Sequence, residues 1–184
     1  MRADAVALKL LVFCGWTAGA VVGMEFLSYV LHRWIFHGPL WILHASHHRK
    51  RTGALERNDA FAVFFAAASI ALMLWGLSDP LASVSFPVGL GMTVYGLLYF
   101  SVHDMLTHKR FYPWSTRSRW LESVRRAHLR HHQAVDKTGS EPFGLFLFRR
   151  PNSVGRRDDA YDEAATVEPS APTDASGERR RRTV

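Results

Sequence analysis

The sequence predicts an all-α integral membrane protein with about three to four transmembrane helices. Two observations support this fold class. Hydrophobic residues make up 48% of the 184 residues, and they are gathered in long segments. Residues 60–77 and 80–102 contain no charged residue, and residues 10–32 contain only Glu25. A helix of about 20 apolar residues is long enough to cross the hydrocarbon core of a bilayer.

The first apolar segment, about 8–31, begins like a signal peptide. Arg2 and Lys9 precede the apolar run, and the small residues AGA at 18–20 resemble a cleavage site. However, the run continues to Ile35. We therefore expect a retained transmembrane helix.

The other predicted spans are residues 60–77 and 80–102. Only LSDP (77–80) separates them, which predicts a tight hairpin with Pro80 as the helix breaker. Two buried helices of a soluble protein are the alternative, but residues 60–77 are apolar on every helical face. The third span contains residues that could kink or split it: Pro87, Gly89 and Gly91.

Residues 115–133 predict a surface helix. Ser115 or Thr116 could cap its first turn. Its arginines are expected to face lipid headgroups, while three apolar side chains enter the membrane interface. These are Trp120, Leu121 and Val124.

The sequence divides into a membrane-embedded domain, residues 1–150, which contains all the histidines, and a polar tail, residues 151–184. The tail lacks apolar periodicity and ends in an arginine run, so we expect it to be disordered. Cys14 is the single cysteine, which excludes a disulfide framework within the chain.

All ten histidines fall in four short motifs, HRWIFH, HASHH, HDMLTH and HLRHH. Two motifs follow the first predicted span and two follow the third. Because two crossings lie between these halves, both sets reach the same membrane face. The ten residues are His32, His37, His44, His47, His48, His103, His108, His128, His131 and His132.

Basic residues identify that face. Lysines and arginines flank both histidine sets, whereas the hairpin at 77–80 has none. Because positive charge is enriched on the cytoplasmic side, we expect a cytoplasmic histidine-rich site.

The histidine spacing indicates metal binding. In H-x-x-H-H the three rings share a helix face and could bind one centre. In H-x4-H the rings lie roughly 140° apart on a straight α-helix, so this pair suits a helix end. Ten ligands would supply two metals with five each. Imidazole suits iron, zinc, copper and nickel, but a structural zinc site usually has four ligands and includes cysteine.

Four carboxylates are candidates for hydrogen bonding to the ligands. Asp59, Asp104 and Asp136 lie near the histidine motifs and could instead cap helices or remain solvated. Glu25 lies two turns before His32 within a span, where a charge is costly. We expect its carboxylate to accept a hydrogen bond from a ligand imidazole or from a nearby group that contacts the ligands; pairing with Arg33 or a backbone group is the alternative.

The four motifs, together with MEF, ERNDAFAVFFA and YGLLYFSVHD, resemble the bacterial β-carotene hydroxylases of the fatty acid hydroxylase superfamily. The resemblance covers about residues 20–150. It implies a non-haem di-iron monooxygenase of the bacterial inner membrane, with all ten histidines as catalytic iron ligands. In HASHH, Ala45 and Ser46 stand where relatives often have a charged residue.

The resemblance implies that ring carbon 3 of β-carotene is hydroxylated to give β-cryptoxanthin and then zeaxanthin. Dioxygen is the implied co-substrate, and a ferredoxin-type donor supplies electrons from NAD(P)H. A fatty acid or sterol hydroxylase or desaturase and a carotenoid ketolase are alternatives with the same ligand chemistry. A histidine-rich metal carrier is disfavoured, because its ligands should lie near the bilayer midplane.

Overall fold

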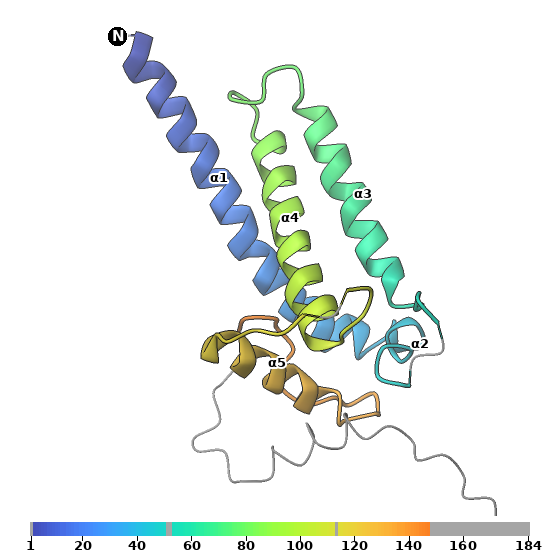
Figure 1. Cartoon of the computed structure of the whole chain (residues 1–184). Coiled ribbons are helices and arrows are strands. Elements are labelled where there is room, and N and C mark those ends of the chain that lie inside the picture. Colours follow the sequence, from blue (N-terminus) through green and yellow to red (C-terminus); the bar gives the residue numbers. More distant parts are fainter. Residues whose placement is uncertain (1, 51–52, 113, 148–184) are drawn as a thin grey trace, which may run out of the picture. The chain divides into compact units, whose positions relative to one another are not determined.

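Three long helices form the framework: α1 (Arg2–Val30), α3 (Asp59–Trp75) and α4 (Ser85–Tyr99). The computed structural model describes residues 2–50, 53–112 and 114–147, all within the unit Met1–Arg150. These described residues contain no β-strand. Helix α4 contacts both α1 and α3 (Figure 1).

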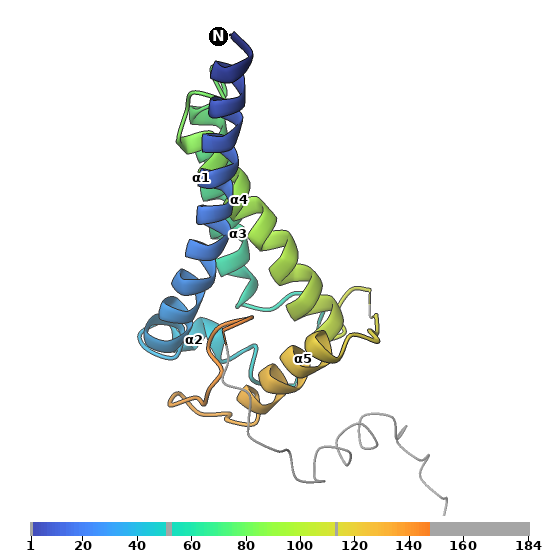
Figure 2. The ribbon, with the colours of Figure 1, turned by 90° about the vertical axis from the view of Figure 1, so that its left-hand side faces the viewer.

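Two of the long helices change their winding at the same end of the framework. Helix α1 continues into the π-helical segment η1 (Leu31–Phe36), and α4 continues into η2 (Phe100–Thr107). The short helix α2 (Trp41–His44) follows η1. Helix α5 (Arg119–His131) packs against η2 and lies at the end opposite the N-terminus (Figure 2).

Two glycines allow α4 to approach both neighbouring helices closely. A Cβ atom on Gly91 would lie 2.5 Å from the Thr17 carbonyl oxygen in α1, and one on Gly89 would lie 2.7 Å from the Ser69 carbonyl oxygen in α3. Such distances are too short for a non-bonded contact between a carbon and an oxygen atom. The glycines predicted to kink α4 therefore provide its packing surfaces.

A small apolar core joins α5 to the end of α4. It contains Val102, Leu106, Val124 and Leu145, each buried. Ser118 caps α5 by accepting a hydrogen bond from the Leu121 backbone N–H at 3.4 Å.

The all-α class is confirmed, and two helical stretches, Ala3–Phe36 and Ser85–Thr107, are long and apolar enough to cross a membrane. The segment predicted as the second span forms an apolar helix of 17 residues, α3. The tail predicted to be disordered, 151–184, lies outside the described residues.

Two details of the predicted surface helix were wrong. Its cap is Ser118, because Ser118 itself is extended and the helix begins only at Arg119. Val124 was expected at the membrane interface but is 1% exposed. The reason is that this face of α5 packs on η2 and on the chain around Leu145.

Replacement of Gly91 by alanine should loosen the contact between α1 and α4. The added Cβ would meet the Thr17 carbonyl oxygen and the Ala20 Cβ at 2.5 and 2.6 Å, and overpacking of this kind costs about 1–3 kcal/mol. Gly91→Ala should therefore unfold at a lower temperature in detergent micelles. Gly19→Ala is the matched control, because its Cβ would meet nothing within 4 Å. An equal Tm for both variants would contradict this packing role.

Candidate metal centre

The two H-x4-H motifs lie on the π-helical segments. The backbone N–H of His37 donates to the His32 carbonyl at 3.0 Å, and the N–H of His108 donates to the His103 carbonyl at 3.0 Å. Such i→i+5 hydrogen bonds define a π turn and place the paired residues nearly one above the other. We expected a breaking helix end to align each pair. This expectation is confirmed, because each π segment ends at the second histidine of its pair, His37 after η1 and His108 after η2.

The ten histidines form two groups, each drawn from both halves of the chain. In each group the potential ligand nitrogens all lie within 4.8 Å of one another. We call these groups the first and second centres. The first centre comprises His32, His37, His44, His48 and His131. The second centre comprises His47, His103, His108, His128 and His132.

The H-x-x-H-H motifs therefore do not each serve one centre, contrary to the expectation from their helical spacing. His44 and His48 belong to the first centre, whereas His47 belongs to the second. In the other triplet, His128 and His132 belong to the second centre and His131 to the first. The i+3 and i+4 positions are separated by roughly 100° around a helix axis, so their rings can face opposite sides of a shared boundary.

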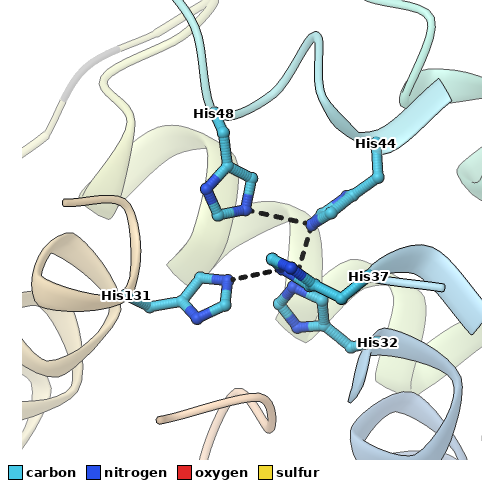
Figure 3. Close-up of side chains that lie close together, drawn as sticks. All are labelled: His32, His37, His44, His48 and His131. Carbon is cyan, nitrogen blue, oxygen red and sulfur yellow. Dashed lines mark hydrogen bonds between the residues drawn. The ribbon is translucent and has the colours of Figure 1, made fainter. Parts of the chain in front are cut away.

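In the first centre, Nε2 atoms face one another (Figure 3). The Nε2 atom of His44 lies 3.0 Å from that of His32 and 3.1 Å from that of His48. The Nε2 atoms of His37 and His131 are 3.2 Å apart.

The other ring nitrogen of each first-centre histidine faces an oxygen acceptor. The Nδ1 atom of His44 lies 2.7 Å from Asn58 Oδ1. The remaining four Nδ1 atoms face backbone carbonyls. Their pairs are His32 with Phe143 at 2.7 Å, His37 with Lys137 at 3.2 Å, His48 with Ala134 at 2.9 Å, and His131 with Ser140.

These contacts fit a bound cation. A carbonyl only accepts, so each Nδ1 carries the proton and each Nε2 presents a lone pair. Burial lowers the pKa of His44 and His131 to about 3 and that of His48 to about 4. At neutral pH these rings are therefore neutral, and no proton stands between the Nε2 atoms. A metal ion among them would turn mutual lone-pair repulsion into coordination.

The second centre also brings Nε2 atoms together but has fewer acceptors behind its rings, since the buried Nδ1 atoms of His103 and His128 have no hydrogen-bond partner within the described part of the chain. Its Nε2 atoms also approach each other, at 3.0 Å between His47 and His103 and 2.9 Å between His128 and His132. The His47 Nδ1 atom donates to the Glu56 carboxylate at 2.9 Å. The buried His108 Nε2 atom has no hydrogen-bond partner, as expected for a nitrogen directed at a metal position.

A buried guanidinium organises the carboxylates beside the second centre. Arg110 is 3% exposed and donates to both carboxylate oxygens of Asp59, at 2.9 and 2.7 Å. It also donates to Asp104 at 2.8 Å. Lys109 and Phe111 have positive φ values of 48° and 39°, so the backbone is strained on both sides of Arg110.

Only one of the four predicted carboxylates directly approaches a histidine of either centre. Asp104 lies 3.5 Å from His103 Nδ1, longer than a usual hydrogen bond. Among the described residues, Asp59 contacts no histidine directly; it pairs with Arg110, which also pairs with Asp104. Asp136 accepts hydrogen bonds from the backbone N–H groups of Thr138 and Gly139 at 3.0 and 3.3 Å. The Thr138 hydroxyl also donates to this carboxylate; this bond first, and then the backbone N–H of Gly139, lower the pKa of Asp136.

Glu25 also differs from the expectation, since no imidazole donates to it among the described contacts. Its carboxylate accepts from the Tyr95 hydroxyl at 2.9 Å and from the backbone N–H groups of Phe146 and Leu147, both at 2.8 Å. The alternative of a backbone partner is therefore the observed one. The reason is that residues 143–147 fold back over the end of α1 and occupy the space between Glu25 and the rings.

The sequence reasoning missed Glu56 and Asn58, which accept hydrogen bonds from His47 and His44. Both lie in the polar segment ERND that immediately precedes α3. Their proximity to HASHH was the available signal. The sequence could not indicate the backbone acceptors, because every residue has a carbonyl group.

An apolar cavity of about 350 Å³ meets both centres. Its walls come from α1, α3, α4 and the π-helical segments, and they include Phe36, Ala66 and Tyr99. His32 and His44 of the first centre and His103 of the second line it. The cavity can therefore hold an apolar molecule against the metal positions.

The fatty acid hydroxylase family model matches residues 17–149. The chain belongs to this family. It is thus an oxidoreductase, and the family uses non-haem iron. The resemblance that the histidine motifs indicated is confirmed.

Curated relatives of this chain are similar over most of its length. It is 40% identical to the β-carotene hydroxylase of Pseudescherichia vulneris, over 83% of this chain and 92% of the relative. It is 44% identical to the β-carotene hydroxylase of Pantoea ananas, over 72% and 75%. For β-carotene 3-hydroxylase 2, chloroplastic, of Arabidopsis thaliana, identity is 42% over 71% of this chain and 44% of the relative. No solved structure matches the chain.

Two double variants should separate the centres. His44→Ala with His48→Ala removes two ligands from the first centre and none from the second. We expect one metal to be lost and the other retained in detergent-purified protein, as measured by elemental analysis and metal titration. His44→Ala with His47→Ala removes one ligand from each centre, so both affinities should fall together. The same titration curve for both double variants would contradict the division of the triplets.

Proposed function

We propose that this protein is a β-carotene 3-hydroxylase that adds a hydroxyl group at carbon 3 of each β-ionone ring. The products would be β-cryptoxanthin and then zeaxanthin. Relatives that are 40–44% identical and carry the names β-carotene hydroxylase or β-carotene 3-hydroxylase support this substrate.

The observation that carries the proposal is the apolar cavity beside both histidine groups. β-Carotene is a long hydrocarbon dissolved in the bilayer, so its ring must enter from lipid. Most of the cavity wall consists of apolar side chains and small residues of α3 and α4, while three histidines and the charged group of Asp59, Asp104 and Arg110 also line it. Phe36 and Phe61 stack at 3.8 Å between ring centroids within this wall. A flat surface of this kind suits contact with an apolar ring.

We propose that the ten histidines hold two iron ions, five ligands to each. The open coordination position at each ion would be available to dioxygen or a reacting group. Bound iron supplies the reduction of dioxygen, with electrons from NAD(P)H through a ferredoxin-type donor. The protein fixes ligand orientation, places the substrate and excludes water. The oxygen atoms that accept hydrogen bonds from Nδ1 fix the orientation of the ligands.

We also propose that the histidine-containing end faces the cytoplasm from a bacterial inner membrane. Arginines and lysines flank both histidine sets, and the hairpin between α3 and α4 has none. This bias supports a cytoplasmic orientation. It would bring a soluble electron donor to the same side as the metals.

The direct test is expression in β-carotene-producing bacteria followed by pigment chromatography. Wild-type protein should convert β-carotene to β-cryptoxanthin and zeaxanthin, and His131→Ala should nearly abolish conversion at equal membrane abundance. Unchanged β-carotene with hydroxylated or desaturated fatty acids or sterols would identify the alternative lipid substrate. Keto products would identify a ketolase.

A second variant should test the cavity without touching the metal ligands. Ala66 lines the cavity, so Ala66→Phe should fill it and lower hydroxylation by on the order of 10–100-fold through substrate misplacement. Metal content should not change. Ala67→Phe is the matched control, because Ala67 is an exposed neighbour outside the cavity lining. Equal turnover in the two variants would exclude this cavity as the substrate site.

A further inference from the structure

The chain after α5 provides a regular set of acceptors to the first centre. We call residues 134–147 the strap. Its carbonyl groups at every third position from 134 to 143 face a different histidine Nδ1 atom. The strap positions are Ala134, Lys137, Ser140 and Phe143, paired with His48, His37, His131 and His32.

The strap is specific to the first centre. Among the described residues, no strap carbonyl accepts a hydrogen bond from a histidine of the second centre. The acceptor of His47 is instead Glu56, which precedes α3. A displacement of the strap would therefore change the orientation of four first-centre rings and leave the second-centre acceptors in place.

Local contacts hold the strap against the rings. Asp136 stabilises its first turn through the backbone N–H groups of Thr138 and Gly139. Gly139 has φ +63°, and a Cβ there would lie 2.7 Å from His37 Nδ1. Glu141 forms an ion pair with Arg33 at 2.7 Å. These two side chains are 52% and 41% exposed, so their pairing adds little stability.

Glu25 is the buried anchor at the other end of the strap. One carboxylate oxygen accepts from the backbone N–H groups of Phe146 and Leu147, both at 2.8 Å. The other accepts from the Tyr95 hydroxyl at 2.9 Å. The residue is 8% exposed, and hydrogen bonds to a buried charged group are stronger than neutral ones. Gly144 permits this approach, since a Cβ there would lie 2.7 Å from Glu25 Oε1.

We propose that Glu25 is a positioning residue for the first metal centre alone, acting through the strap. This inference rests on the proposed metal-binding function and deepens it. Glu25 fixes the end of the strap, the strap carbonyls fix Nδ1–H on four rings, and the Nε2 lone pairs are thereby directed at one metal position. The second centre is independent of this chain of contacts.

The test isolates each centre before changing Glu25. In a His128→Ala and His132→Ala background, the first centre retains all its ligands; in a His44→Ala and His48→Ala background, the second does. Metal-free protein in detergent is titrated with Co²⁺ and followed by its visible absorption. Glu25→Leu should weaken binding by about 10–100-fold in the first background, as expected for loss of support behind ligating histidines. It should leave binding in the second background unchanged.

Two variants distinguish positioning from a general structural role. Glu25→Gln keeps an oxygen acceptor for the two backbone N–H groups, so it should restore most of the first-centre affinity. Glu56→Leu is the matched control, because it removes the acceptor of His47 Nδ1 and should therefore weaken the second centre and spare the first. Equal weakening of both centres by Glu25→Leu, or no weakening of either, would overturn the inference.

A further variant applies if Glu25→Leu does not accumulate in the membrane. Tyr95→Phe removes one donor to Glu25 at nearly constant volume, so it should weaken the first centre to a smaller degree. Unchanged first-centre affinity in Tyr95→Phe, together with absent Glu25→Leu protein, would reduce Glu25 to a folding residue. If the wild-type chain binds no metal, the proposed function itself fails. If it binds two metals and Glu25→Leu does too with equal affinity, only this inference fails.

Discussion

The structure depends on directing unprotonated imidazole nitrogens at one another in a buried space. Neighbouring Nε2 atoms are 2.9 to 3.2 Å apart in the two groups, a separation that two lone pairs do not favour. In the first centre, acceptors on the opposite side of all five rings hold the protons away, and burial keeps His44, His48 and His131 neutral. A cation bound between the Nε2 atoms would accept their lone pairs and so remove this repulsion. The π turns, the strap and the polar segment before α3 all maintain this geometry.

The two centres offer the same kind of ligand, imidazole, but differ in the oxygen atoms that lie behind those ligands. Neutral oxygens, four backbone carbonyls and the Asn58 amide, face the first centre. The second centre has carboxylates close to it, Glu56 at His47 and Asp104 beside His103. An anionic acceptor makes an imidazole a stronger electron donor than a neutral acceptor does. Ions bound at the two positions would therefore have unequal electronic environments, although each group offers five imidazoles.

Much of the architecture follows from the sequence, because hydrophobic run length and histidine clustering are strong signals. They predicted the all-α class, the helices around Glu25 and Tyr95, and convergence of all ten histidines at one end. The division of the triplets was not predictable from spacing alone. It depends on how α2 and α5 are oriented across the boundary between the centres, and tertiary packing sets that orientation. The two backbone partners of Glu25 were likewise hidden, because they lie about 120 residues away in the chain and every residue carries a backbone N–H.

The interleaving of the ligands also determines when the protein can acquire its metals. Four ligands of the first centre come from the N-terminal half, but the fifth is His131, and the second centre needs His128 and His132 as well as His47. Synthesis proceeds from the N-terminus, so neither ligand set is complete until the end of α5 has left the ribosome. The carbonyls that orient the first set follow later still. The apolar helices are made before that point, so metal binding at either centre could begin only late in the synthesis of the chain.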